Sequence, residues 1–168
     1  MKKFDIVLLV IIAIVAKLLF FPKGPTVCKF MRIYANSNGD PVSLAEVKAI
    51  TPDGLNASDT NKGATAVQTS TNTAHHDASA GQAIDGNYDS IFDNGSVSLT
   101  LPGIGEFWQL NIVPTIIAEV VVTNRSDRAD KGIPDHLAGC TLILYDEKNK
   151  EFFRATLNKN PTQSFIIT

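Results

Sequence analysis

One short run in this chain carries side chains that could bind a metal or take part in catalysis, His75-His76-Asp77. Adjacent side chains on an extended chain point to opposite faces, so the two histidines are poorly placed to chelate one ion. The sequence holds no accompanying Cys or Glu cluster, which favours a solvated loop. It also holds no Ser/His/Asp order, paired-carboxylate motif, P-loop or H-E-x-x-H motif. These observations predict a protein that is not an enzyme.

The two cysteines, Cys28 and Cys140, are too few for a disulfide framework and lack the spacing of a zinc site. Two interpretations stay open from the sequence. The thiols bond to each other if the fold brings them together, or they stay separate, with Cys140 buried in a strand as a small apolar side chain.

The composition is that of one ordinary globular domain with about two dozen residues to spare. Hydrophobic residues make up 44% of the 168 residues and charged residues 19%, which excludes a disordered chain. The formal net charge is −2, and Lys and Arg are scattered. Because positive charge supplies most non-specific affinity for nucleic acid, we expect no nucleic-acid partner.

Residues 1–22 predict a transmembrane signal anchor. Apolar side chains dominate for about 18 residues, which as a helix span about 27 Å and match a bilayer core. Lys17 interrupts the run but lies close enough to one end to reach the headgroups. The anchoring contacts are expected from Phe4, Ile6, Leu8, Ile11, Leu18 and Phe21.

A cleaved signal peptide is the competing interpretation of this segment. A cut after Ala16 would place Ile14 where a small residue is wanted, so the retained anchor is preferred. Lysines flank both ends of the run and barely decide its orientation. A signal-like start places the C-terminal domain outside the cytoplasm or, in a virus, between an internal membrane and the capsid. That placement permits glycosylation at three sequons, which begin at Asn56, Asn94 and Asn124.

After the anchor, a linker is predicted over residues 23–29 and one domain over 30–168. Short β-branched or aromatic segments separated by turn residues predict a β-sandwich. Leu44, Val47 and Ile50 are expected to point inward. The polar stretch 51–95 resembles a flexible linker in composition, but a domain this small favours ordered loops there. No helix longer than a turn or two is expected, and the predicted strands are Val27–Tyr34, Ser43–Ile50, Ser96–Leu101, Phe107–Ile112, Ile117–Thr123, Thr141–Tyr145, Phe152–Leu157 and Ser164–Ile167.

Several short motifs occur in a characteristic order between residues 30 and 157. They are Leu44-Ala-Glu-Val47, Asn56-Ala57, Gly63-Ala-Thr65, Gln82-Ala-Ile-Asp-Gly-Asn87, Phe107-Trp-Gln-Leu-Asn-Ile112, the segment 117–125, His136-Leu-Ala-Gly139 and the strand 141–146. In this order they resemble discoidin domains, the C-type domains of coagulation factors V and VIII, and their fucose-binding lectin relatives. The resemblance implies an all-β, jelly-roll-like β-sandwich of about eight strands.

The physical character of these motifs fits such a sandwich. Gly86 suits a turn with positive φ, in which Asp85 accepts hydrogen bonds from backbone amides. Phe107 and Trp108 are expected to supply apolar area to the core. Arg125 follows an apolar strand and is expected at the rim, where sandwich loops gather.

The resemblance also implies candidate ligand residues. Lectin relatives bind sugar at the rim through a His and two Arg residues. Arg125 matches the first Arg, His136 replaces the second, and Leu99 stands where the His is expected. The implied ligand-binding set is Asn124, Arg125 and His136. Arg125 equally suits a structural role, bonded to loop carbonyls or to Asp127.

Calcium is the one cofactor that the resemblance implies. Family members often hold a structural calcium ion in the loop that corresponds to residues 83–87. Asp85, Asn87 and Ser96 offer the oxygen ligands that calcium prefers, and Ser98 is a further candidate. An Asp beside a Gly is also a common turn residue.

The first functional hypothesis is a non-enzymatic structural protein that tethers a membrane to a neighbouring protein layer, for example an envelope-associated component or a minor capsid protein of a virion. The replaced sugar residues and the short stalk before Val27 motivate it. The alternative is a membrane-bound carbohydrate-binding lectin or adhesin with a glycan partner. A third hypothesis is lipid recognition, with Ile91 and Phe92 as a small apolar spike.

Overall fold

The computed structural model describes residues 24–73, 77–127 and 132–168. The predicted anchor and the His75-His76 pair lie outside these residues. Within the described ranges, no helix combines the length and apolar character needed to cross a membrane. The transmembrane helix therefore stays a prediction.

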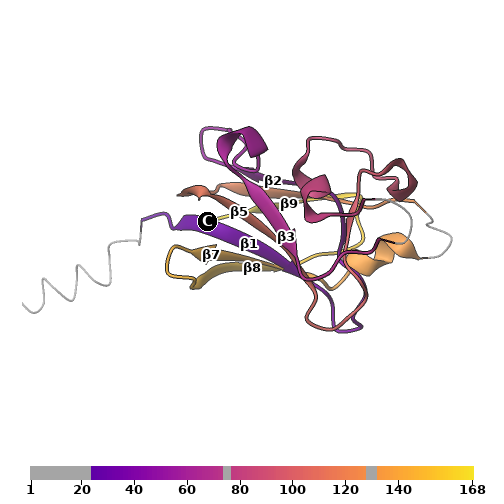
Figure 1. Cartoon of the computed structure of the whole chain (residues 1–168). Helices are drawn as coiled ribbons and strands as arrows, with labels where there is room; N and C mark the ends of the chain where they lie inside the picture. The colour runs from indigo at the N-terminus through magenta and orange to yellow at the C-terminus, as the bar shows by residue number, and fades with distance from the viewer. Residues whose placement is uncertain (1–23, 74–76, 128–131) are drawn as a thin grey trace, which may run out of the picture.

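The described chain is all-β, as predicted, with two antiparallel sheets packed as a β-sandwich (Figure 1). The first sheet has the order β3-β5-β1-β7-β8 and the second the order β4-β2-β6-β9. The helical segments described are 3-10 turns of at most five residues, η1 (Thr60–Lys62), η2 (Ala80–Ile84), η3 (Phe92–Asn94) and η5 (Ile133–Leu137). The strands are β1 (Val27–Tyr34), β2 (Ser43–Ile50), β3 (Thr65–Gln68), β4 (Ser98–Leu99), β5 (Phe107–Ile116), β6 (Glu119–Asn124), β7 (Thr141–Asp146), β8 (Glu151–Thr156) and β9 (Thr162–Ile166).

The first two strands have the predicted bounds, since their apolar alternation is strong. Strand β1 starts three residues before the predicted beginning of the domain at residue 30, so the linker is shorter than predicted. Strand β3 was not predicted, because its sequence TAVQ lies inside the polar stretch 51–95. It pairs with β5 at the edge of the first sheet, which gives this polar stretch its order.

The core lies between the sheets and takes alternate residues from both. Trp108 is fully buried and donates from its indole nitrogen to the Ala80 carbonyl at 3.0 Å, which ties η2 to the core. The prediction for Phe107 was wrong. Its side chain is half-buried on the outer face of the first sheet, because successive strand residues point to opposite faces.

Strand β2 shows why one inward residue was predicted wrongly. Leu44 and Val47 are both fully buried although they are three positions apart, because the register shifts between Leu44 and Glu46. Beyond that irregularity the two-residue alternation makes Ala49 the next buried residue, and Ile50 is half-buried.

The two ends of the sandwich differ in what they contain (Figure 1). We call the end with η2, η3 and η5 the loop end. The other end, which we call the proximal end, consists of residues 24–28, 50–57, 113–118, 146–151 and 166–168. There β1 begins beside the end of β5, since Val27 pairs with Ile116, and beside the β7–β8 turn, since Cys28 pairs with Asp146.

This arrangement settles the relation of the two cysteines. Cys28 lies at the proximal end of β1, whereas Cys140 immediately precedes Thr141, which pairs with Tyr34 at the other end of β1. About six strand residues, or about 20 Å, separate the two levels, far beyond the reach of a disulfide. Both thiols are free and buried. Burial raises the pKa of Cys28 to about 12 and that of Cys140 to about 11, so both stay protonated at neutral pH.

Candidate functional site

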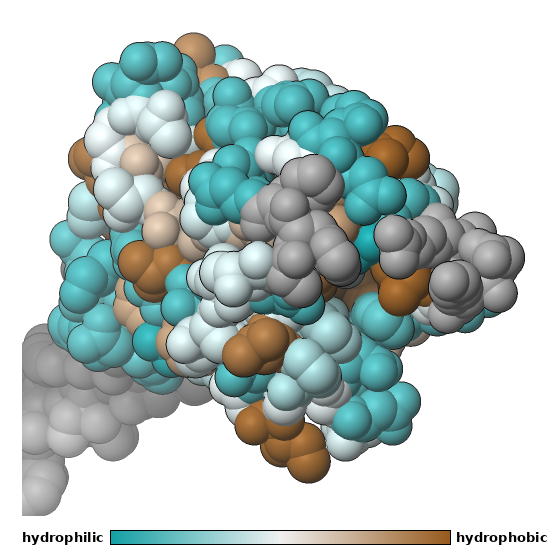
Figure 2. Space-filling view, turned by 45° about the vertical axis from the view of Figure 1, so that its right-hand side comes forward, coloured by the Kyte–Doolittle hydropathy of each residue, from teal (hydrophilic) through white to brown (hydrophobic). Residues whose placement is uncertain are grey.

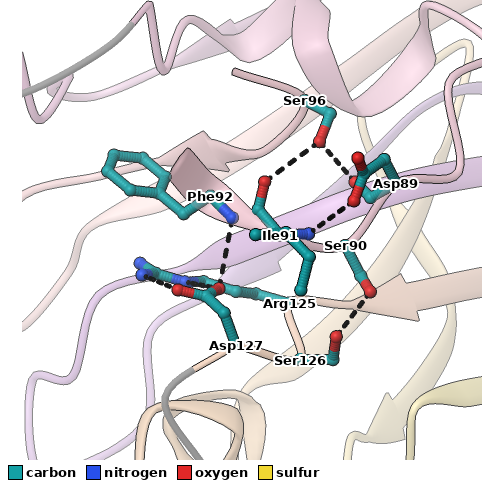
Figure 3. Close-up of polar contacts among 8 residues, drawn as sticks. All are labelled: Asp89, Ser90, Ile91, Phe92, Ser96, Arg125, Ser126 and Asp127. Carbon is teal, nitrogen blue, oxygen red and sulfur yellow. Dashed lines mark hydrogen bonds and ion pairs between the residues drawn. The ribbon is translucent and has the colours of Figure 1, made fainter. Parts of the chain in front are cut away.

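Arg125 is the best-defined polar residue at the loop end (Figure 3). Its guanidinium donates two hydrogen bonds to Asp127, from Nε to Oδ1 at 2.6 Å and from Nη2 to Oδ2 at 2.7 Å. The two side chains are only 6% and 9% exposed. The Phe92 ring lies against the guanidinium, with its centroid 4.4 Å from Cζ. The Arg125 guanidinium is thus fixed between the Asp127 carboxylate and the Phe92 ring.

Arg125 and Asp127 form an ion pair that is largely shielded from solvent. Burial by itself raises the pKa of Asp127, but hydrogen bonds from Arg125 and from the Phe92 N–H bring the pKa below its ordinary value. Asp127 is therefore ionised at neutral pH. Of the two predicted roles for Arg125, these contacts are those of the structural one.

The burial of Phe92 contradicts part of the lipid-binding hypothesis. Phe92 is only 5% exposed and forms part of a small core cluster with Ala45, Ala78, Val97 and Leu99. It cannot act as half of an apolar spike. Of these two neighbouring residues, Ile91 is the exposed one, at 36%. The prediction failed because the sequence does not show which of two adjacent apolar loop residues turns inward.

A second group of contacts joins the η3 loop to the end of β6. The Ser96 hydroxyl, which is buried, donates to the Asp89 and Ile91 carbonyls. Asp89 Oδ1 accepts the Ile91 N–H at 3.0 Å. The hydroxyls of Ser90 and Ser126 lie 2.6 Å apart, and the Ser126 N–H donates to the Ser90 carbonyl at 3.0 Å. These bonds make the loop end a self-bonded structure (Figure 3).

The residues predicted to hold calcium take part in hydrogen bonds within the protein. Asp85 Oδ1 accepts the Asn87 N–H at 2.7 Å, as expected of a turn in which Gly86 has a φ of 82°. With its nitrogen turned toward this loop, the Gln82 amide donates to Asp85 Oδ2 at 3.1 Å. Ser96 uses its hydroxyl as a donor to carbonyls. Among the residues described, no three His, Cys, Asp or Glu side chains gather as metal ligands.

The other predicted sugar ligands face different neighbours. Asn124 is 1% exposed and donates from Nδ2 to the Lys159 carbonyl at 3.5 Å, so this sequon is closed in the folded chain. His136 lies in η5, and its carbonyl accepts from Asn36 Nδ2 at 3.3 Å. Leu99 is 6% exposed. Asn124 and Leu99 are therefore buried, whereas His136 is half-buried and its imidazole stays a predicted ligand group.

Glu46 is a chemically distinctive residue that the sequence did not single out. It is 2% exposed on β2, and its Oε2 has no hydrogen-bond partner. Burial, and then the nearby Asp85, raise the pKa of Glu46 to about 7. It lines a polar hollow of about 210 Å³ whose rim includes Lys48 and Tyr88, with the Lys48 amino group 4.5 Å from the Tyr88 ring centroid. Sequence reasoning missed Glu46 because the loop beside it, which contains Asp85 and Gly86, lies about forty residues farther along the chain.

A second unpredicted feature is an aromatic cluster on the outer face of the first sheet. Arg32 lies at its centre, with Cζ between 4.4 and 5.9 Å from the centroids of four rings. Its Nε donates to Gln109 Oε1 at 2.6 Å. All four rings are half-buried, and they belong to Phe30, Tyr34, Phe107 and Tyr145. We call this group the Arg32 cluster.

The comparisons with known proteins give no family for this chain. No family model matches it, and no curated protein or solved structure matches it either. The discoidin resemblance rests on the ordered motifs in the sequence.

Proposed function

We propose that this protein is a non-enzymatic, membrane-anchored interaction protein, whose discoidin-like jelly-roll domain tethers a bilayer to a neighbouring protein layer. The observation that carries the proposal is the opposition of the two ends. The described chain enters β1 at the proximal end, directly after the apolar run, and the loop end lies at the far side of the sandwich. A chain anchored by residues 1–22 therefore presents its loop end away from the bilayer and leaves the outer sheet faces open to a partner.

The Arg32 cluster supports a protein as the partner. Tyr, Phe and Arg are enriched at protein interfaces, where rigid aromatic side chains add contact area at a small entropic cost. Here the rings hold the guanidinium in place, and the Arg32 Nη1 donates to the Tyr34 hydroxyl at 2.8 Å. A half-exposed side chain that is ordered before binding loses little freedom when a partner covers it.

The lectin alternative draws no support from the loop end. A sugar hydroxyl would have to compete with the Asp127 carboxylate for the guanidinium of Arg125. Charge-assisted bidentate pairs of this kind are stronger than hydrogen bonds to neutral hydroxyls. Arg125 therefore suits the stability of the loop end better than recognition of a glycan.

Membrane extraction tests the anchor. We expect the full chain to stay in the membrane fraction through high-salt and alkaline washes and to leave it only in detergent. The Ile6→Lys/Ile11→Lys double variant should move to the soluble fraction, because it adds one charge near the centre of the run, where charge is costly in hydrocarbon, and shortens the apolar run at its start. Ile6→Leu/Ile11→Leu is the matched control. Release of the unmodified chain by salt alone would contradict the proposal.

Complex size tests the tether. After mild detergent solubilisation of the native membrane, the chain should migrate in a complex larger than itself. An Arg32→Glu/Phe107→Ser variant should migrate as the free chain and keep its circular dichroism spectrum. Thr156→Glu, which changes an exposed residue of β8, serves as the control. Migration of the unmodified chain alone would count against a neighbouring protein layer.

A further inference from the structure

The proximal end exposes large apolar side chains from separate segments. Leu55 is 54% exposed, Val113 60% and Ile166 63%. Backbone hydrogen bonds hold these segments together, from the Ala118 N–H to the Ile50 carbonyl at 2.7 Å and from the Ile167 N–H to the Ala118 carbonyl at 2.8 Å. The exposed apolar groups therefore belong to one end of the molecule.

Two hollows deepen this apolar surface. The first, of about 380 Å³, is lined by two prolines, three isoleucines and Phe152 together with smaller residues, and includes Pro52, Ile116 and Ile167. The second, of about 310 Å³, is lined by Leu55, Val113 and Pro114 among others. Thr51 and Thr115 of the second hollow directly precede Pro52 and Ile116 of the first, so the two hollows are neighbours.

The loop end is different in character. Figure 2 brings this end forward, and hydrophilic or near-neutral residues cover most of the face, with hydrophobic residues in separate spots. Contiguous exposed apolar surface on a soluble protein usually marks a binding site for another apolar surface. The proximal end is thus the side that calls for a covering partner.

The chain itself indicates which partner. The apolar run in the sequence ends at Phe21, and β1 begins at Val27. Six residues of fully extended chain reach about 20 Å. A bilayer that holds residues 4–21 therefore lies within that distance of the proximal end.

We propose that the proximal end is a membrane-contacting surface that rests on the interfacial region of a lipid bilayer, with Leu55 and Val113 among the acyl chains. This inference depends on the proposed anchor and extends it, because the folded domain itself then touches lipid. Burying such side chains in the interface adds affinity in proportion to the apolar area removed from water.

Charges around the surface indicate the class of lipid. Lys29 and Lys62 border the apolar groups, and Lys29 donates to Asn149 Oδ1 at 3.2 Å. Lys148 and Lys150 of the β7–β8 turn add positive charge, and four carboxylates in the same segments offset it, Asp53, Asp146, Glu147 and Glu151. The contact therefore depends on apolar area more than on anionic headgroups, and zwitterionic phosphatidylcholine is the appropriate probe.

Spin labelling of the full chain in phosphatidylcholine vesicles tests the inference. Labels are placed at Leu55→Cys and Val113→Cys, and at Ile104→Cys as the control, since Ile104 is 85% exposed in the loop before β5. The native thiols are fully buried, which directs the label to the introduced cysteine. We expect labels at 55 and 113 to relax several-fold less with a water-soluble nickel chelate, and more with oxygen, than the label at 104.

Each other outcome overturns the inference in a distinguishable way. If the labels at 55 and 113 meet the nickel chelate as freely as the label at 104, while the protein resists alkaline washing, the domain stands clear of the bilayer and the anchor proposal survives. If the protein washes off, both proposals fail. If the labels are shielded from nickel and oxygen alike, a protein surface covers this end.

Discussion

The loop end and the proximal end differ in how far their polar and apolar groups are paired or covered within the protein. At the loop end, buried charges and hydroxyls pair with one another, as Arg125 does with Asp127 and Ser90 with Ser126. At the proximal end, Leu55 and Val113 extend into solvent without covering side chains of comparable size. A surface whose groups satisfy each other is built for stability, whereas a surface that leaves apolar area open is built for contact. Mutations at the loop end should therefore lower the stability of the fold, and mutations at the proximal end should change binding.

The largest loss of stability is expected where the core supports the loop end. Trp108→Ala leaves a large cavity and removes the donor to the Ala80 carbonyl, which should lower the free energy of unfolding by about 3–5 kcal/mol. Chemical denaturation of the detergent-solubilised chain, followed by circular dichroism, measures this. Trp108→Phe keeps most of the volume and isolates the hydrogen bond. An equal loss in both variants would show that packing contributes little.

Arg125→Ala should cause the next largest loss and lower the free energy of unfolding by about 3 kcal/mol, because it leaves the buried Asp127 carboxylate without its partner. The lowered pKa of Asp127 means that the pair stabilises the fold above the ordinary pKa of Asp and that this stability is lost as pH falls through the lowered value. The difference between the variant and the unmodified chain should therefore shrink below about pH 4.

A double-mutant cycle with Asp127→Ala separates the pair from its surroundings. If the ion pair dominates, the double variant should lose much less stability than the two single losses added together. Full additivity would show that Arg125 acts mainly through its packing on Phe92.

Glu46→Gln should instead raise the free energy of unfolding. The raised pKa of about 7 means that the folded state binds a proton more tightly than the unfolded state, so stability falls as pH rises from about 4.5 through 7. Because Gln carries no proton to lose, the variant should be more stable than the unmodified chain by about 2 kcal/mol at pH 8 and nearly equal to it at pH 5. Thermal unfolding at both pH values tests this, and parallel pH profiles for the two chains would refute it.

The smallest effect on stability is expected at the proximal end. Leu55→Ser and Val113→Ser should each change the free energy of unfolding by less than about 0.5 kcal/mol, because these side chains are already exposed in the folded chain. Denaturation of the same detergent-solubilised chain measures this. A loss as large as that of Arg125→Ala would place both residues in the packed framework and remove the contrast between the two ends.

Much of the sheet framework could be predicted from the sequence, because strand alternation is local. The bounds of β1 and β2 follow from apolar residues that recur within a few positions. Strand β3 could not be predicted, since its order comes from pairing with β5 some forty residues later. The candidate site was predicted less well. The position of Arg125 at the rim was anticipated, but the burial of Phe92 beneath it was not.

Local sequence was enough to predict the all-β class, the turn at Gly86 with its positive φ and the apolar character of residues 4–21. These depend on neighbours within a few positions along the chain, where steric and periodic rules act directly. Other features needed the packed fold: Cys28 and Cys140 lie apart, Glu46 is buried, and Leu55, Val113 and Ile166 come to the same end of the sandwich. Each of these depends on which distant segments the sheets bring together, because burial and pairing are properties of the packed assembly and not of any short stretch.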